Sequence, residues 1–215
     1  MKIPEEWTFK NSDVAEGFDN HVREQLPWYD LVTGGMKQLA RHYIPQDGLV
    51  YDIGASTGNI GRALNETLKE RNARLVALEE SQEMCDLYDA PGELVKIDAM
   101  DYKFQDYDLA ICFLVLMFFP EAKRWEFLQY LKQHIKPGGA LIIVDKCEAC
   151  TGYLATALWR ISLAGKIAAG VDAESVISKE LSLCGIQRPI DPKLLGDDAI
   201  EWFRFGDFAG WIITR

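Results

Sequence analysis

The sequence predicts one mixed α/β domain with a mostly parallel, doubly wound sheet that is closed by a C-terminal antiparallel hairpin. Short apolar runs alternate with helical segments from residue 49 to residue 146, the pattern of right-handed βαβ crossovers. Two aromatic-rich runs flank Gly206 and Asp207 near the end of the chain, which favours a hairpin at residues 200–215. A length of 215 residues suits a single hydrophobic core.

Residues 1–48 are predicted to form an N-terminal helical cap. Apolar residues recur at every fourth position from Val14 to Leu26, which places them on one face of a helix. Pro27 interrupts the pattern, and a second helix is expected from about Trp28 to Tyr43.

Residues 49–146 are predicted to form the sheet-bearing core. The expected strands lie at 49–53, 74–78, 93–97, 108–114 and 140–144, with helices from residue 59, at 81–88 and at 121–135. Ile60, Leu64 and Leu68 form an apolar stripe on the first of these helices. The last helix is expected to stop at Lys136-Pro-Gly-Gly139, because proline prevents its continuation and glycine permits a left-handed turn.

Residues 147–199 are predicted to be a helical insertion, with helix to about Leu183. Its apolar stripe includes Trp159, Leu163 and Ile167, and indicates either core packing or a contact between subunits. We find no repeat, low-complexity tract or linker, so the whole chain, 1–215, is expected to be one domain.

Composition and charge disfavour several classes of protein. The net charge of -10 repels phosphate backbones and anionic lipids. The longest apolar run, Leu109–Phe119, is shorter than the about 20 residues of a spanning helix, so no membrane association is expected. The start of the chain lacks an apolar signal core, which favours a cytoplasmic protein. Cys147 and Cys150 have CxxC spacing, but no second pair follows, so we expect no metal.

Chemistry-bearing residues follow three successive strands, where an open parallel sheet binds its ligands. After the first strand the chain reads Asp52-x-Gly54-x-x-x-Gly58, a turn that lets the backbone approach a ligand and offers helix N–H groups to a carboxylate. Glu79 ends the second strand about 25 residues later, where an acid can accept both ribose hydroxyls. Asp98 and Ala99 follow the third strand. There a carboxylate can accept from the exocyclic amine of an adenine, and the Ala99 N–H can donate to its ring.

Two of these positions argue against a dinucleotide. Ser56 and Asn59 stand where a dinucleotide fingerprint has its second and third glycines, so a pyrophosphate fits poorly. Each acid alone is most often a solvated turn residue, and the ordered combination carries the prediction.

The combination, followed by KPGGALIIV, resembles the Rossmann-like fold of class I S-adenosylmethionine (SAM)-dependent methyltransferases. Within that group the chain is similar to carboxy-SAM synthases and related tRNA uridine methyltransferase-like proteins. The resemblance covers nearly the whole chain. It includes VAEGFDNHVREQLPWYD, VYDIGASTGNIG, LVALEESQEM, IKPGGALIIVDK and the terminal WFRFGDFAGWII.

The resemblance implies a cofactor site for SAM, or for a derivative such as carboxy-SAM, in the core. Tyr29 would pack on the cofactor, Glu79 and Glu80 would flank its ribose, and Asp98 and Ala99 would hold its adenine. Its methionine end would lie against Gly54, Ala55 and Ser56.

Two positions depart from the synthase pattern. Phe113 stands where the synthases have an asparagine, and Leu181 stands where they have the arginine that binds the extra carboxylate. A carboxylate in an apolar pocket needs a cation. Carboxy-SAM synthesis would therefore require Arg160, Lys166 or Arg188 to substitute.

No universal catalytic residue is expected, because methyl transfer from a sulfonium mainly needs donor and acceptor to be aligned. The candidates are His21, Asp145, Lys146 and Arg204, with Asp19 beside them in the N-terminal segment. Each has an alternative: His21 could be a partly exposed helical residue, Asp145 and Lys146 a surface ion pair, and Arg204 a side chain lying along the hairpin.

The sequence thus favours a SAM-dependent methyltransferase acting on a small molecule or a nucleic-acid base, and the charge makes the small molecule the better substrate. The alternatives are a carboxy-SAM synthase-like enzyme that uses a small acid as carboxyl source, and a SAM-binding protein without catalysis. The resemblance and the apolar helices between residues 150 and 185 also imply a homodimer.

Overall fold

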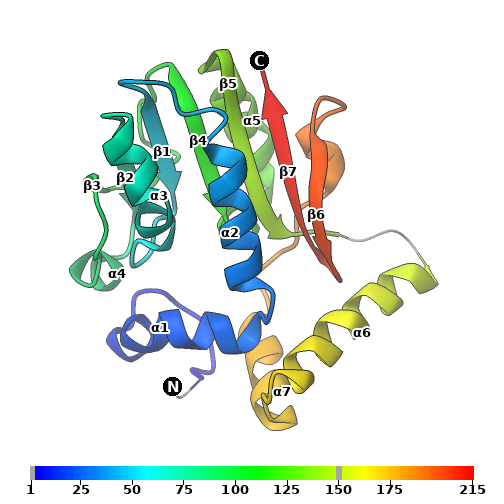
Figure 1. Cartoon of the computed structure of the whole chain (residues 1–215). Helices are drawn as coiled ribbons and strands as arrows, with labels where there is room; N and C mark the ends of the chain where they lie inside the picture. The colour runs from blue at the N-terminus through cyan, green and yellow to red at the C-terminus, as the bar shows by residue number, and fades with distance from the viewer. Residues whose placement is uncertain (1–2, 149–151) are drawn as a thin grey trace.

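A seven-stranded sheet in the order β3-β2-β1-β4-β5-β7-β6 forms the centre of the molecule (Figure 1), in a computed structural model that describes residues 3–148 and 152–215. The first five strands of that order pair in parallel, and β7 runs antiparallel to both β5 and β6. The predicted fold class is therefore confirmed. The strands are β1 (Leu49–Ile53), β2 (Arg74–Glu79), β3 (Glu93–Lys96), β4 (Tyr107–Phe113), β5 (Ile135–Lys146), β6 (Ile200–Phe205) and β7 (Phe208–Thr214).

Helices cover both faces of the sheet. Figure 1 shows α2 in front of the sheet and α5 behind it, while α1, α6 and α7 lie beyond the carboxyl ends of the parallel strands. Several boundaries differ from the prediction by a few residues, as at α2 and α4. The helices are α1 (Ser12–Gln25), α2 (Tyr29–Ala40), α3 (Asn59–Glu70), α4 (Gln82–Asp86), α5 (Glu121–Gln133), α6 (Tyr153–Ala168) and α7 (Ala173–Ser182), with 3-10 turns η1 (Leu116–Phe118) and η2 (Pro192–Leu195).

The core is divided by the sheet into two layers. Alternate residues of a strand point to opposite faces. Tyr51 of β1 packs in the cluster that contains Phe127 of α5, whereas its neighbour Val50 packs with Met36 of α2 and Leu64 of α3. Every residue of β1 is buried, as expected for a central strand covered on both faces.

The segment after α5 was predicted wrongly. The helix ends at Gln133, and Ile135 already pairs with Tyr107 as the first residue of β5. Gly138, with φ +81°, lies in an irregular stretch of this strand, where its N–H donates to the carbonyl of Arg215. The ladder between β4 and β5 shifts register at this point. Gly138 and Gly139 therefore lie in the irregular part of β5, and they do not end α5.

The insertion contains two helices in place of the single stretch that was predicted. Gly170, with φ +92°, separates them, and the Asp172 side chain caps α7 by accepting the Ser175 N–H. Cys147 forms an isolated parallel bridge to Ile190, and Cys150 lies outside the described residues.

The predicted hairpin is confirmed, and its turn packs tightly against α6. A Cβ at Gly206 would lie 2.2 Å from the Oγ of Ser162, so the turn admits only glycine in this packing. None of the helices in the described part of the chain has the length and apolar character needed to cross a membrane.

Candidate functional site

A pocket of about 340 Å³ opens at the carboxyl ends of β1, β2 and β4. These strands meet where the strand order reverses, which is where open α/β sheets bind their ligands. The predicted residues that the structure brings together at this pocket are Tyr29, Gly54, Ala55, Ser56, Glu79, Glu80, Asp98, Ala99 and Phe113.

The loop after β1 is held in a tight turn. Gly54 has φ +74°, and a Cβ there would lie 2.4 Å from a methyl carbon of Val115. The N–H groups of Gly54 and Ala55 both donate to the carbonyl of Leu78 at 2.9 Å. Glycine is thus required by both conformation and space, as predicted.

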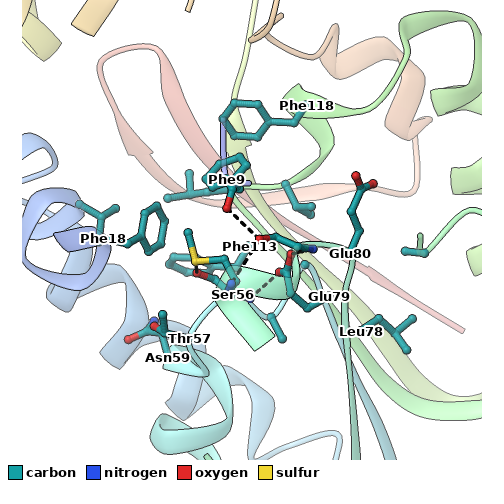
Figure 2. Close-up of a pocket in the computed structure, with 18 of the residues that line it drawn as sticks. Phe9, Phe18, Ser56, Thr57, Asn59, Leu78, Glu79, Glu80, Phe113 and Phe118 are labelled. Carbon is teal, nitrogen blue, oxygen red and sulfur yellow. Dashed lines mark hydrogen bonds between the residues drawn. The ribbon is translucent and has the colours of Figure 1, made fainter. Parts of the chain in front are cut away.

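Glu79 bridges two loops at the pocket. Its Oε2 accepts the N–H of Ser56 at 2.8 Å and its Oε1 accepts the N–H of Ser81 at 2.9 Å (Figure 2). Burial raises the pKa of Glu79 above its ordinary value, although these two N–H groups oppose the rise. Each carboxylate oxygen has a further lone pair, so the side chain can still accept from a ligand.

Aromatic side chains form the opposite wall. Figure 2 shows Phe9 and Phe118 together above the Ser56–Glu79 hydrogen bond, with Phe18 beside them. Tyr29 stands edge-on to Phe113, with 5.5 Å between the ring centroids. Sequence reasoning missed Phe9, Phe18 and Phe118 as pocket residues, because nothing local to them indicates which face they meet.

Two further acids of the pocket, Asp98 and Glu80, each have one partner within the chain. Asp98 accepts the N–H of Met100 at 2.9 Å through Oδ1. Glu80 forms an ion pair with Lys10 at the pocket mouth, where both side chains are half exposed. Asp98 therefore keeps Oδ2 for a ligand, and Glu80 is held near the edge.

Asp19 links the N-terminal helix to the glycine loop. Its Oδ1 accepts from the hydroxyl of Thr57 at 2.7 Å, and its Oδ2 pairs with Arg62 at 2.8 Å. Asp19 also lines the pocket, so α1 forms part of the wall.

A second cavity, of about 90 Å³, adjoins the first. Trp7, Phe9, Phe18 and Phe118 line both cavities. His21 and Lys146, two of the candidate catalytic residues, line only the second. His21 is buried and stacks on Trp7, which contradicts the alternative of a partly exposed helical histidine.

Two residues of the glycine motif lie outside the pocket. Gly58 has φ +98°, and a Cβ there would meet Ala90 at 2.5 Å, so this glycine serves packing and not approach to a ligand. Asp52 is buried inside β1, and neither of its oxygens has a hydrogen-bond partner within residues 3–148 and 152–215. Burial, reinforced by Glu79, raises the pKa of Asp52 to about 8.

Two catalytic candidates also lie elsewhere. Asp145 is fully buried and accepts the N–H groups of Leu116 and Lys146, and burial raises its pKa to about 7. It is interior because β5 continues to Lys146, paired with Phe208. Arg204 pairs with Glu201 outside both cavities.

Of the three residues considered as substitutes for the synthase arginine, only Lys166 lines one of the two cavities. Arg188 pairs with exposed Glu121, and Arg160 is exposed, so neither reaches a cavity. Leu181 is 66% exposed. Lys166 is buried and lines the second cavity. Over the described ranges no cluster of three His, Cys, Asp or Glu side chains has the arrangement of a metal site.

Comparison of the sequence with known families matches residues 50–139 to a family described as a methyltransferase domain. The chain is 28% identical to a carboxy-S-adenosyl-L-methionine synthase of Staphylococcus epidermidis, and the alignment covers 99% of this chain and 98% of that protein. It is 25% identical to the protein of the same name from Shewanella pealeana, over 92% of this chain and 85% of the relative.

Solved structures share the fold. The plantazolicin methyltransferase BpumL in complex with SAH superposes with a TM-score of 0.64 at 11% identity, over 94% of this chain and 89% of that one. Human N-acetylserotonin methyltransferase in complex with SAM gives 0.59 at 12% identity, over 96% of this chain and 57% of the human one, so this chain spans little more than half of that enzyme. Both likenesses confirm the predicted architecture.

Proposed function

We propose that this chain, a SAM-dependent transferase whose residues 50–139 form a methyltransferase domain, moves the methyl group of SAM to a small molecule. The proposal rests on the pocket at the point where the strand order of the sheet reverses. One side of this pocket is formed by the glycine loop and by acidic residues, and the other side by aromatic rings.

The pocket suits each part of SAM. Glu79 offers carboxylate lone pairs to ribose hydroxyls, and Asp98 with the Ala99 N–H suits an adenine edge. The turn at Gly54 and the start of α3 suit an amino-acid carboxylate. Ring faces attract a cation such as a sulfonium, so the wall of Phe9, Phe18 and Phe118 suits the reacting end.

When bound, SAM supplies an electrophilic methyl group on a positively charged sulfur. The chain's own contribution is to orient and to exclude water. The two hydrogen bonds of Glu79 hold the loops after β1 and β2 at a set separation. The Asp19–Thr57 contact holds α1 over the glycine loop. Alignment of this kind is the largest part of what displacement at carbon needs.

A small acceptor is favoured over a nucleic acid. The net charge of -10 opposes binding of a phosphate backbone. Beyond the donor pocket the space narrows to the second cavity of about 90 Å³, which is walled by aromatic rings. This space suits part of a small molecule.

The second candidate is a carboxy-SAM synthase-like enzyme. It is supported by the two relatives of that name, which align with nearly the whole chain. Against it stands Leu181, which is exposed at the position matched to the synthase arginine. Of the three residues considered as a replacement for that arginine, only Lys166 lines one of the two cavities, and its Nζ is paired with Glu180 at 2.9 Å.

A second copy of this chain is the partner we propose for α6. This helix leaves large apolar side chains exposed, including Trp159 at 44%, Leu154 at 50% and Ile167 at 49%. Figure 1 shows α6 extending away from the sheet. Its length and apolar face suit pairing with the same helix of a second copy.

Mass spectrometry of nucleosides released from the purified protein, with calorimetric titration of SAM and carboxy-SAM, tests the function. Bound SAM or SAH, with SAM preferred in titration, supports methyl transfer. A carboxylated nucleoside would move the assignment to the synthase reaction. An empty protein that binds neither compound would leave a protein without this chemistry.

A further inference from the structure

The second cavity contains an unusual concentration of buried amines. Lys166 and Lys179 are 7% and 8% exposed, and Lys146 reaches the same space from the end of β5. The rest of the lining is largely apolar and aromatic, as at Trp7, Phe118 and Phe208. Buried lysine is rare unless it is paired, so each of these amines needs a partner.

Two of the three lysines have carboxylate partners. The Lys166 Nζ lies 2.9 Å from Oε1 of Glu180. The Lys146 Nζ lies 3.7 Å from Glu180 and 3.7 Å from Asp207, and it donates to the Gln187 side chain at 3.2 Å. Two ammonium groups thus face two carboxylates, which balances the charge without any contribution from Lys179.

Lys179 is the exception. Its Nζ lies over the ring face of Trp7, and it forms no ion pair with a carboxylate of residues 3–148 or 152–215. Lys179 lies on the buried face of α7. Val176, three residues before it, and Leu183, four residues after it, are buried on the same face.

Two further polar atoms in the same lining lack partners. Within the described ranges, Nε2 of His21 and Oε1 of Gln25 have no hydrogen-bond partner, and their residues are only 7% and 6% exposed. Both side chains come from α1 and line the second cavity. Buried polar groups without partners are uncommon. His21 Nε2 can donate to a ligand oxygen in the tautomer that carries its proton there, whereas Gln25 Oε1 can only accept and gives no support for an anion.

We propose that the second cavity binds a carboxylate group of the second substrate, that Lys179 is the amine which receives it, and that His21 completes the site by donating to it from Nε2. The proposal rests on the proposed function, whose acceptor it describes more closely. The second cavity, of about 90 Å³, is much smaller than the first, of about 340 Å³, so we assign it the carboxylate group and not the whole substrate. The apolar body of the acceptor therefore extends past the shared Phe18 and Phe118 toward the donor pocket.

This site differs from the one that the synthase resemblance implies. The matched position there is Leu181, which is exposed and lines neither cavity. Lys179 lies two residues earlier, and the helical turn places it on the buried face of α7. The carboxylate could belong to an acceptor or to carboxy-SAM itself, and the experiment separates the two.

Binding at this site is coupled to a proton. Burial, with Lys166 beside it, lowers the pKa of Lys179 to about 5, although Glu180 opposes the change. The other groups facing the cavity are His21, whose pKa burial and Lys179 lower to about 4, and the paired Lys146, Lys166 and Glu180. Lys179 is therefore neutral at pH 7, and an arriving carboxylate raises its pKa. Affinity should fall as the pH rises above 5.

Titration of the SAM-loaded full-length protein with phenylacetate, and with its neutral analogue phenylacetamide, tests the site. We expect phenylacetate to bind more tightly than the amide, and Lys179→Met to weaken phenylacetate by roughly ten-fold or more without affecting the amide. Lys123→Met, at an exposed lysine of α5, is the matched control and should change neither. Equal binding of acid and amide, or an unaffected Lys179→Met variant, overturns the proposal.

Calorimetry in two buffers of different ionisation enthalpy at pH 7 provides a second readout. Wild-type protein should take up a proton with phenylacetate, and Lys179→Met should not. Titration with carboxy-SAM in the same variants identifies the source, since a loss of carboxy-SAM affinity alone assigns the carboxylate to the donor and overturns the acceptor site. SAM affinity is measured in parallel: if SAM does not bind to wild type, the proposed function fails, whereas intact SAM binding with no acid preference removes only this site.

Discussion

The carboxylate of Glu79 accepts the backbone N–H of Ser56 at 2.8 Å, and thereby joins the end of β2 to the glycine loop that follows β1. Ser56 has φ +51°, a left-handed conformation that is uncommon for a residue with a side chain. The hydrogen bond helps to hold the loop in that conformation, so the same carboxylate shapes the pocket and offers its remaining lone pairs to a ligand.

Replacing Glu79 with Gln or Ala should weaken SAM binding by roughly ten-fold or more, because hydrogen bonds to a charged acceptor are worth about 1.5–3 kcal/mol. Calorimetric titration measures the affinity, and a thermal melt shows whether the variant still folds. Glu70→Gln, an exposed residue of α3, is the control. Wild-type affinity in Glu79→Ala would remove this residue from the site.

Gly54→Ala should destabilise the protein by about 2 kcal/mol or more and abolish SAM binding. The new Cβ would lie 2.4 Å from Val115 in a backbone conformation with φ +74°. Urea denaturation measures the change in the free energy of unfolding. Gly34→Ala provides the contrast, since a Cβ there meets nothing within 4 Å and helical alanine is favourable. Similar stabilities of the two variants would contradict the account of Gly54.

Asp52→Asn should stabilise the protein increasingly as the pH rises. Burial raises the pKa of Asp52 from its ordinary 3.8 to about 8 in the folded state, so folding takes up a proton between these values. The wild-type free energy of unfolding therefore falls across that window, by up to about 1.4 kcal/mol per pH unit, and the asparagine removes this contribution. Denaturation at pH 5, 7 and 8.5 checks it, with exposed Asp101→Asn as the control. A difference independent of pH would show that Asp52 does not titrate in this window.

Leu181→Arg should leave the affinity for carboxy-SAM unchanged. The resemblance matches this position to the arginine that binds the extra carboxylate in the synthases, but Leu181 is 66% exposed and lines neither cavity. Calorimetric titration of carboxy-SAM against the variant and the wild type measures this. A gain of ten-fold would show that the side chain reaches the site after all.

Trp159→Glu should convert a dimer into monomers, because it places a charge in the apolar face of α6. Light scattering over a range of concentrations gives the mass. Trp125→Glu is the matched control, since Trp125 is also exposed, at 58%, but lies on α5. A monomeric wild type, or equal effects of the two changes, would exclude pairing through α6.

The parts of the fold that local patterns encode were predictable. Alternating apolar runs gave the order of strands and helices, and Gly54 with Glu79 marked two strand ends that do meet at one pocket. Asp145 also stands near the end of a strand in the sequence, as Glu79 does. It is nevertheless buried inside the fold, because β5 continues one residue beyond it in its pairing with β7. A strand's last paired residue depends on its neighbours, which sequence alone does not show.

The aromatic wall and the buried lysines could not be predicted because tertiary packing brings them together. Trp7 and Phe118 are more than a hundred residues apart, and nothing near either one indicates that they share a cavity. Lys179 had a usable signal, its helical spacing from Val176 and Leu183, which places it on the buried face of α7. A lysine is normally expected on the solvent side of a helix because of its charge, but Lys179 is buried.

The Trp7 N–H donates to the carbonyl of Ser182, at the end of α7. Trp7 precedes the matched region of residues 50–139 and Ser182 follows it, so this hydrogen bond joins two segments that lie outside that region. Substitutions in these two segments would therefore change the lining of the second cavity and leave the ends of β1 and β2 at the first pocket unchanged. A fragment limited to residues 50–139 would lack Trp7, Phe9, Phe18 and Tyr29, and with them the N-terminal part of the pocket wall.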